Sequence, residues 1–388
     1  MRAFVFTDKA LARLAGRFVW LEIDTERAEN APLEKKLAVG ALPTFYVLDP
    51  DSERVALRWV GGATVPQLEK ILEDGRLAVA GKQAAGKGEV RGGAADAALA
   101  RADRLYGEDK NAAAAPAYQE ALAQAPAGWP RYARAVESLL FALQATKDNE
   151  TAAKLAREAF PRLATSPSAA NVAATGLDCA LKLPSENAQS ADLVAALEAD
   201  ARAVVGDAKL DVAADDRSAA YISLLDARKK AKDEAGAKDV ATRWASFLEA
   251  EAARAKSPDQ RTVFDSHRLS AYLELGAPER AIPMLEASER DLPQDYNPPA
   301  RLAVAYKAMQ RWDEALAASD RALPKAYGPR QLGLLQTRSD IYVGRGDSDA
   351  ARRTLADALA LAESLPAPQR SESTLTNLRK KLEALAQR

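Results

Sequence analysis

The spacing of hydrophobic positions changes along the chain, and the change falls near residue 75. Before it, short apolar runs alternate with segments whose apolar residues lie three or four positions apart, as Leu33 and Leu37 do. After it, helical spacing continues almost to the C-terminus. The expected elements of the first part are strands at Phe18–Asp24, Thr44–Leu48 and Arg54–Val60 and helices at Asn30–Val39 and Val65–Glu73. The pattern therefore predicts an α/β region followed by an all-α region.

A stretch rich in Gly, Ala and Lys separates the two parts. Because such a composition buries little apolar surface, it is typical of a flexible linker. We therefore expect an N-terminal domain over residues 1–75, a linker over 76–95 and a helical domain over 96–388. A chain of 388 residues is long enough for two or three domains of ordinary size.

The helical part contains an internal repeat, which is clearest near the C-terminus. Tyr272, Tyr306 and Tyr342 lie 34 and 36 residues apart. Small or aliphatic residues follow each tyrosine at offsets of nine, thirteen and sixteen: Ala281, Leu285 and Ser288; Ala315, Ser319 and Ala322; Ala351, Leu355 and Ala358. The copies resemble tetratricopeptide repeats, which implies stacked helical hairpins that approach closely at the small residues.

The same offsets extend the repeat in both directions. An earlier copy begins at Leu105 and a further one at Leu143, whereas residues 163–261 predict helices without a clear register. The turn after the first helix of the last three copies is expected at Gly276, Gln310 and Gly346. Leucines spaced three or four apart in Glu372–Arg388 predict a helix that caps the array.

The N-terminal part resembles a thioredoxin domain that lacks its first strand. Met1–Asp8 is similar to the family segment after the Trp-Cys-x-x-Cys motif, and Phe18–Asp24 to the strand that ends in an aspartate. Val39–Phe45 matches the V-x-x-x-P-T signature, and Gly61-Gly62 falls where family members carry glycine. The expected fold class is thus an α/β thioredoxin-like domain joined to an all-α solenoid of tetratricopeptide type.

The resemblance implies a substrate-binding loop at Leu42, Pro43 and Thr44. An Xaa-Pro bond reaches the cis isomer at a cost of roughly 0.5–1 kcal/mol. A cis Leu42-Pro43 bond would let the backbone of Leu42 pair with an extended substrate, as the family loop does. The alternative is that Pro43 only opens a strand, where its missing N–H is tolerated.

The redox pair of that family is absent from the chain. Cys179 is the only cysteine, and it lies in an apolar helical stretch where we expect a small buried side chain. Thiol–disulfide exchange needs an attacking thiolate and a resolving partner, so one remote thiol cannot supply it. A start codon assigned too far downstream would explain the missing strand and cysteines. It would also hide a targeting segment, and the resemblance then hints at a bacterial periplasm.

Composition excludes several other classes of protein. The formal net charge of −1 gives no electrostatic case for nucleic acid or anionic membrane, and no apolar run reaches the length of a membrane span. The single histidine, His267, excludes a His-based metal cluster. No glycine-rich phosphate loop follows a strand. We therefore expect no metal and no cofactor, and a protein or peptide as the partner.

Stacked helical hairpins present their inner helices to an extended peptide or a partner helix. Four basic residues on predicted inner helices are candidates to line this groove: Arg268, Arg301, Lys307 and Arg338. The alternative for each is a solvated charge on the outer surface.

Two functions remain open. The first is a thiol–disulfide oxidoreductase whose repeats recruit a client and whose cysteines are encoded upstream of this chain. The second is a redox-inactive adaptor that binds proteins through the repeats. The resemblance favours the first for the gene, while the polypeptide as written supports binding only.

Overall fold

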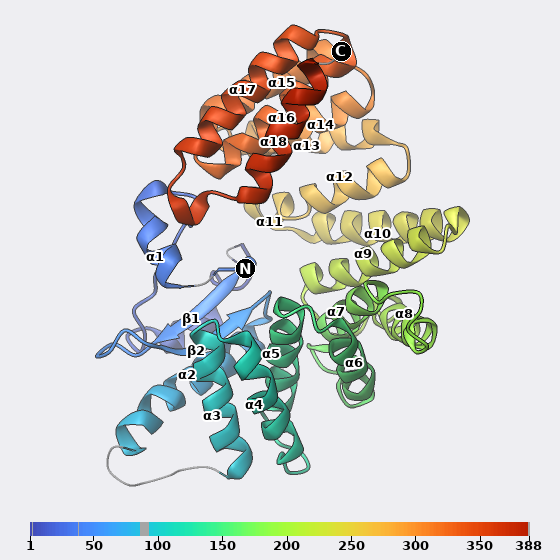
Figure 1. Cartoon of the computed structure of the whole chain (residues 1–388). Helices are drawn as coiled ribbons and strands as arrows, with labels where there is room; N and C mark the ends of the chain where they lie inside the picture. Colours follow the sequence, from blue (N-terminus) through green and yellow to red (C-terminus); the bar gives the residue numbers. More distant parts are fainter. Residues whose placement is uncertain (2, 38, 86–92, 387–388) are drawn as a thin grey trace. The chain divides into compact units, whose positions relative to one another are not determined.

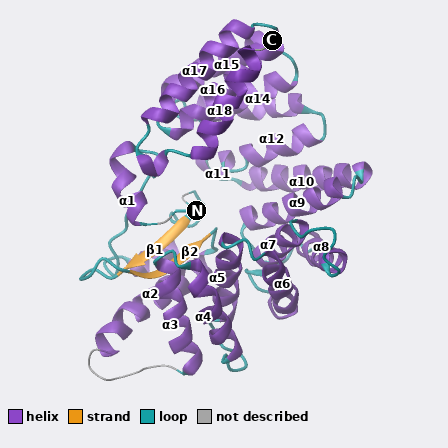
Figure 2. Ribbon diagram, in the orientation of Figure 1, coloured by secondary structure: helices purple, strands orange, loops and turns teal. Residues whose placement is uncertain are grey.

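The computed structural model describes residues 1, 3–37, 39–85 and 93–386. Within them the chain is mainly helical, with one small β-hairpin (Figures 1 and 2). The helices are α1 (Ala31–Lys36), α2 (Val65–Ala85), α3 (Ala94–Gly107), α4 (Asn111–Ala123), α5 (Tyr132–Ala145), α6 (Asn149–Leu163), α7 (Ala169–Leu181), α8 (Ser190–Gly206), α9 (Ala214–Lys230), α10 (Glu234–Arg254), α11 (Pro258–Thr262), α12 (Asp265–Glu274), α13 (Ile282–Asp291), α14 (Asn297–Ala308), α15 (Trp312–Ala322), α16 (Pro329–Arg345), α17 (Ser348–Ser364) and α18 (Glu372–Ala386). The strands are β1 (Thr44–Leu48) and β2 (Val55–Val60).

Contacts divide the chain into two compact units. The first unit comprises Met1–Arg17 and Ala38–Val240, and the second comprises Phe18–Leu37 and Ala241–Arg388. The short segment Phe18–Leu37 therefore belongs to the second unit, although the residues on both sides of it belong to the first. The helix α2 continues through the first half of the segment that composition predicts to be a linker, while residues 86–92 lie outside the described residues. The three predicted domains stay a prediction.

The N-terminal part does not form a thioredoxin fold. Its described residues contain two strands, β1 and β2, which pair antiparallel with Thr44 opposite Val60. The predicted strand at Phe18–Asp24 is wrong: no strand of the described residues pairs with this segment, and Val19 and Leu21 are 89% and 74% exposed. Met1–Asp8, which the resemblance places in a helix, forms turns over residues 3–7. An isolated stretch of β-type sequence cannot satisfy its backbone groups in a sheet, so it stays irregular.

The β-hairpin packs against the first helices of the array. A side chain at Gly75 of α2 would come within 2.6 Å of Val47, and one at Gly107 of α3 within 2.6 Å of Val55, so both glycines are needed for this close approach. The buried guanidinium of Arg58 on β2 donates to the Tyr106 carbonyl oxygen at 3.3 Å. The hairpin therefore covers the start of the helical array.

A buried polar network joins α2, α3, α4 and α5. Arg134 donates to both carboxylate oxygens of Asp103, at 2.9 and 3.0 Å, and to Asp74 at 2.8 Å. Tyr118 donates to the same Asp103 at 2.8 Å. Since bidentate arginine–carboxylate pairs have a narrow geometry, the network fixes how these four helices meet.

Most helices from α3 onward pair with a neighbour in the chain, as in hairpins of tetratricopeptide type. The pairs in direct contact include α3 with α4, α6 with α7, α7 with α8, α14 with α15 and α16 with α17. The prediction of helical repeats is thus confirmed. Residues 163–261, which lack a clear register in the sequence, contain α7, α8, α9, α10 and the short α11. The cap predicted at the C-terminus is α18, whose Leu375 and Leu378 are buried.

One left-handed residue closes the turn of six of these hairpins. The residues with positive φ are Asp109, Lys147, Lys232, Gly276, Gln310 and Gly346. In each case the next residue donates its N–H to the carbonyl five positions earlier, as Asp347 does to Tyr342 at 2.9 Å. This is the Schellman arrangement that ends α-helices. The predicted turn positions at Gly276, Gln310 and Gly346 are therefore confirmed.

Small residues are buried where the repeat pattern places them. The alanines nine positions after each repeat start are fully buried: Ala114, Ala152, Ala281, Ala315 and Ala351. Because alanine adds little bulk beyond the backbone, the two helices of a hairpin can pack closely along this line.

Candidate protein-binding site

The four basic residues predicted to line a groove lie on α12, α14 and α16 of the second unit. Arg338 donates to Asp320 Oδ1 on α15 at 2.6 Å and to Tyr342 Oη at 3.1 Å. Arg268 lies 3.4 Å from Tyr272 Oη, which donates to Glu249 on α10 at 2.6 Å. Arg338 thus links α16 directly to the preceding outer helix α15, whereas Arg268 contacts α10 only through Tyr272 of its own helix.

Lys307 on α14 also has an acidic neighbour. Its Nζ lies 3.5 Å from Asp340 Oδ2 on α16, and the other carboxylate oxygen lies 3.7 Å from Lys381 Nζ on α18. Asp340 is about half exposed, so water screens both pairs and each contributes little.

Arg301 differs from the other three. Within the described part of the chain, its half-buried side chain makes no hydrogen bond and no ion pair. Burial lowers the pKa of Arg301, while the more distant Asp265 and Asp295 act in the opposite direction. Asp265 already accepts a hydrogen bond from Ser288 at 2.6 Å. Arg301 is therefore a cation that has lost water without gaining a direct partner.

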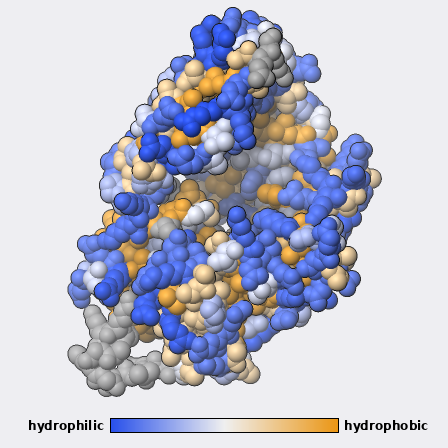
Figure 3. All heavy atoms as spheres, in the orientation of Figure 1, coloured by the Kyte–Doolittle hydropathy of each residue, from blue (hydrophilic) through white to orange (hydrophobic). Residues whose placement is uncertain are grey.

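An aromatic and basic surface lies beside Arg301, where α14 and α16 begin. Tyr296 directly precedes α14. Its pKa is raised overall, because burial and Asp295 raise it more than Arg301 lowers it. The guanidinium of Arg330, on α16, lies 5.7 Å from the ring centre of Tyr296 and 4.8 Å from that of Tyr327. Such cation–aromatic contacts stabilise a positive charge on an exposed face. In Figure 3 hydrophilic residues cover most of the surface of these C-terminal helices, with smaller hydrophobic patches between them.

A segment of the N-terminal region is bound to this surface. Asp24 accepts hydrogen bonds from Tyr327 and from Arg330, the latter at 3.2 Å, and Glu26 forms an ion pair with Arg330. Gln369 donates to the backbone carbonyl oxygens of residues 25 and 27 at 2.7 and 3.0 Å. These contacts join residues more than 300 positions apart, which is why no local pattern in the sequence indicates them.

The predicted substrate-binding loop lies in the first unit. The Leu42-Pro43 bond is cis, and the Pro43 carbonyl oxygen accepts a hydrogen bond from the Gly61 N–H at 2.9 Å. Thr44 Oγ1 donates to the carbonyl oxygen of Ala41 at 2.6 Å, and the Leu42 side chain is 70% exposed. The role of Leu42, Pro43 and Thr44 in substrate binding stays a prediction.

In the described part of the chain, the hydrogen bonds of that loop named above involve backbone groups and the Thr44 hydroxyl, and no thiol or imidazole takes part in them. Cys179 is buried in α7, and burial raises the pKa of its thiol to about 11. His267 packs against Trp244, with ring centres 5.8 Å apart. In the described residues, no group of three or more His, Cys, Asp and Glu side chains could hold a metal ion. None of the described helices is both long and apolar enough to cross a membrane.

A buried carboxyl group in the first unit was not singled out by the sequence. Glu137 on α5 is only 2% exposed and accepts a hydrogen bond from Asn171 Nδ2 at 2.6 Å. Burial raises the pKa of Glu137 to about 8; hydrogen bonds from Ser168 and Asn171 lower it in part, and Asp216 raises it. In the sequence, Glu137 cannot be distinguished from the many exposed glutamates on helices.

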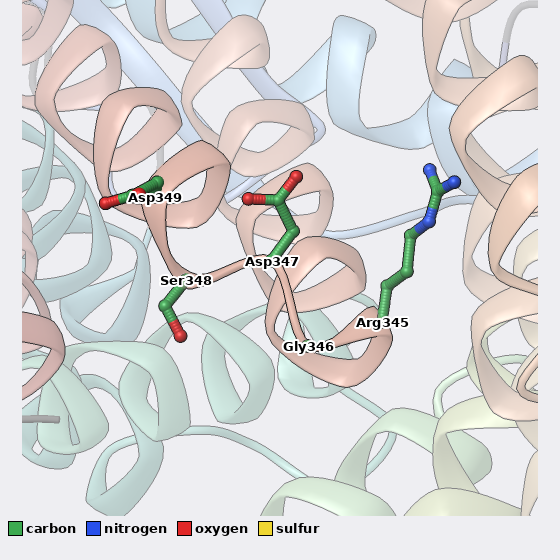
Figure 4. Close-up of a pocket in the computed structure, with 5 residues that line it drawn as sticks. All are labelled: Arg345, Gly346, Asp347, Ser348 and Asp349. Atoms are coloured by element: carbon green, nitrogen blue, oxygen red, sulfur yellow. The ribbon is translucent and has the colours of Figure 1, made fainter.

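One hollow lies at the turn between α16 and α17, lined by Arg345, Gly346, Asp347, Ser348 and Asp349. Figure 4 shows that these side chains point in different directions. Asp347 already accepts the N–H of Ala350 at 2.9 Å as the N-cap of α17, and Arg345 pairs with Asp313 at 3.2 Å. The hollow therefore lies at an ordinary turn between helices, and the polar side chains of Asp347 and Arg345 already have partners within the protein.

The helix pairs, their Schellman turns and their buried small residues define a helical repeat array of tetratricopeptide type, preceded by a two-stranded hairpin. No protein-family model matches the chain, and no curated protein does either. Solved structures that the comparison matches to the chain include a tetratricopeptide repeat protein from Parabacteroides merdae, at 12% identity over 76% of this chain and 100% of that chain, with a TM-score of 0.45. BtubC from P. vanneervenii is 17% identical over 56% of this chain and 82% of its own, with a TM-score of 0.35. The TPR2AB domain of yeast Sti1, solved as a pHSP90 complex, is 12% identical over 75% and 98%, with a TM-score of 0.29.

Proposed function

We propose that this protein is a binding scaffold whose C-terminal repeats hold an acidic peptide segment of a partner protein. The observation that carries the proposal is Arg301, a half-buried cation on α14 without a hydrogen-bond or ion-pair partner in the described residues. A carboxylate supplied by a ligand would satisfy the guanidinium, and a charge-assisted hydrogen bond of this kind contributes roughly 1.5–3 kcal/mol.

The other three predicted groove cations belong to the proposal in a secondary role. Lys307 has a partly exposed carboxylate at 3.5 Å, which a ligand carboxylate can replace at little cost. Arg268 and Arg338 each donate to a tyrosine hydroxyl on their own helix, so they would contact a ligand only after exchanging partners.

Thiol–disulfide exchange has less support. It would depend on the resemblance of the N-terminal region to thioredoxin, and the described residues there form a two-stranded hairpin, the short helix α1 and the start of α2. The one thiol of the chain is buried and has a raised pKa, which disfavours the thiolate needed for attack. The binding scaffold is therefore the function we propose.

The test starts from a phage-displayed library of random peptides selected on the full chain. The strongest binder is synthesised with a fluorescent label, and its affinity is measured by fluorescence anisotropy. We expect an acidic consensus and a loss of affinity of roughly tenfold in Arg301→Ala, which corresponds to about 1.4 kcal/mol. Arg290→Ala is the matched control, because Arg290 is an exposed arginine on the neighbouring α13. Equal losses in both variants, or a library that yields no binder, would contradict the proposal.

A further inference from the structure

The segment that contacts the start of α16 is a compact turn of the second unit. Asp24 Oδ1 accepts the N–H of Glu26 at 3.0 Å, and the Asp24 carbonyl oxygen accepts hydrogen bonds from the Arg27 N–H at 3.2 Å and from Asn30 Nδ2 at 2.8 Å. These bonds close a compact turn that presents two carboxylates on the same side, toward Arg330. The turn is thus stabilised by hydrogen bonds among its own residues in addition to its contacts with the repeats.

The surface of the repeats is complementary to this turn in charge. Arg330 lies between the two carboxylates and contacts both. Tyr327 donates its hydroxyl to Asp24, and this bond, burial and the carboxylate charge raise the pKa of the tyrosine. The guanidinium of Arg27 lies over the ring of Tyr327, 3.9 Å from the ring centre. A short stretch at the start of α16 therefore contacts the side chains of three residues of the turn: an Asp, a Glu and an Arg.

The surface also fits the main chain of the turn. The side-chain amide of Gln369 donates to two carbonyl oxygens of the turn. It therefore recognises the main-chain conformation of the turn and not its side chains. Gly328 has a positive φ of 53°, and a Cβ at this position would overlap the carbonyl oxygen of Glu26. Only glycine allows the turn to approach so closely.

The bound turn is held by contacts that water can replace. The side chains of Asp24 and Glu26 are each 31% exposed, and that of Arg330 is 27% exposed. Ion pairs with this degree of exposure contribute much less to stability than buried ion pairs do. Because the turn is covalently linked to the site it occupies, its high effective concentration compensates for weak individual contacts.

We propose that Tyr327, Gly328, Arg330 and Gln369 form a recognition site for acidic turns of the type Asp-x-Glu, and that residues 24–27 are its resident ligand, which an equivalent acidic turn of a partner protein replaces. The site differs from the inner-helix groove proposed above, because it uses Arg330 in place of Arg301 and a backbone contact from Gln369.

The test uses a labelled synthetic peptide of residues 22–32 and the full chain in three forms: wild type, Asp24→Ala/Glu26→Ala, and the same double variant with Arg330→Ala. We expect the peptide to bind the double variant at least tenfold more tightly than wild type, because loss of both carboxylates weakens the chain's own turn as a competitor. Addition of Arg330→Ala should abolish this binding. Equal affinity for wild type and the double variant, or binding that persists without Arg330, would overturn the proposal.

Two further variants keep the result specific. Gly328→Ala in the double-variant background should also abolish peptide binding, since it blocks the backbone approach while all charges remain. Glu29→Ala should behave as wild type, because Glu29 is an exposed acid beside the turn. Circular dichroism confirms that each variant is folded. The peptide selected on the groove depends on Arg301, whereas this peptide depends on Arg330, so failure of one proposal is distinguishable from failure of the other.

Discussion

Gly346 and Gly333 both belong to the region of α16, but the backbone requires glycine at only one of them. Gly346 has a φ of 88° at the turn that follows the helix, whereas Gly333 lies within the helix. Neither position has a neighbouring atom within 4 Å of an added Cβ, so any effect of alanine comes from the backbone alone.

We expect opposite effects of the same substitution at these two glycines. Gly346→Ala should destabilise the protein by roughly 1–2 kcal/mol, because alanine is strained in the left-handed region. Gly333→Ala should stabilise it by roughly 0.5–1 kcal/mol, because alanine loses less conformational entropy in a helix. Urea denaturation followed by circular dichroism measures both changes. A loss of stability in both variants would show that the backbone angle φ does not determine the effect of alanine at these positions.

Glu137 makes the stability of the first unit dependent on pH. Its pKa in the folded protein, about 8, lies above the usual value of 4.5, so the folded state binds the proton more tightly than the unfolded chain. The stability associated with the protonated group is therefore fully present below about pH 4.5 and is lost as pH rises toward 8. Asp216 on α9, whose pKa burial and Asp215 raise to about 7, acts in the same direction.

Glu137→Gln should flatten this pH dependence. The amide stays neutral and keeps an oxygen that can accept from Asn171, so the variant should lose less stability than wild type between pH 5 and 8. The difference in slope should approach 1.4 kcal/mol per pH unit at most. Denaturation curves at pH 5, 6, 7 and 8 measure it, with Asp211→Asn, an exposed acid, as the control. Parallel curves for Glu137→Gln and wild type would contradict the assignment.

Among the elements, α18 completes the hydrophobic core of the last repeat. Its Leu375 and Leu378 are buried against leucines and alanines of α16 and α17: Leu332, Leu355, Ala358 and Ala362. In a repeat array each hairpin contacts only its neighbours, so the end of the array depends on such a covering helix.

Leu378→Ala should destabilise the C-terminal repeats by roughly 2–5 kcal/mol, the range for a buried leucine that leaves a cavity. Hydrogen exchange should show the loss first in α16, α17 and α18, because the repeats unfold from an end. Thr376→Ala on the exposed face of the same helix is the control. Uniform loss of protection over the whole chain would argue against local coupling.

At the scale of the whole molecule, the parts that the sequence predicts are those specified by neighbouring residues. Turn positions such as Gln310 and small positions such as Ala315 follow the repeat spacing, and the structure confirms both. Helix existence depends on local periodicity, which is why α18 could be placed from its leucines.

The parts that the sequence does not predict depend on distant partners. Phe18–Asp24 has the composition of a strand, but a strand also needs a neighbour, and the described residues supply none. The contact of Asp24 with Arg330 has no signal in either segment, since single acids and arginines are common on helical proteins. Arg301 was predicted with three other cations, and only the structure separates it from them.

The bound turn has a consequence for the order of events during synthesis. The hydrogen bond between Gln369 and the carbonyl oxygen of Thr25 spans 344 residues, so the ribosome makes the turn long before its binding surface. At roughly 5–20 residues per second, this interval lasts roughly 17–70 s. During that time the repeats that contact the acidic turn do not yet exist, and chaperones that bind nascent chains can reach it.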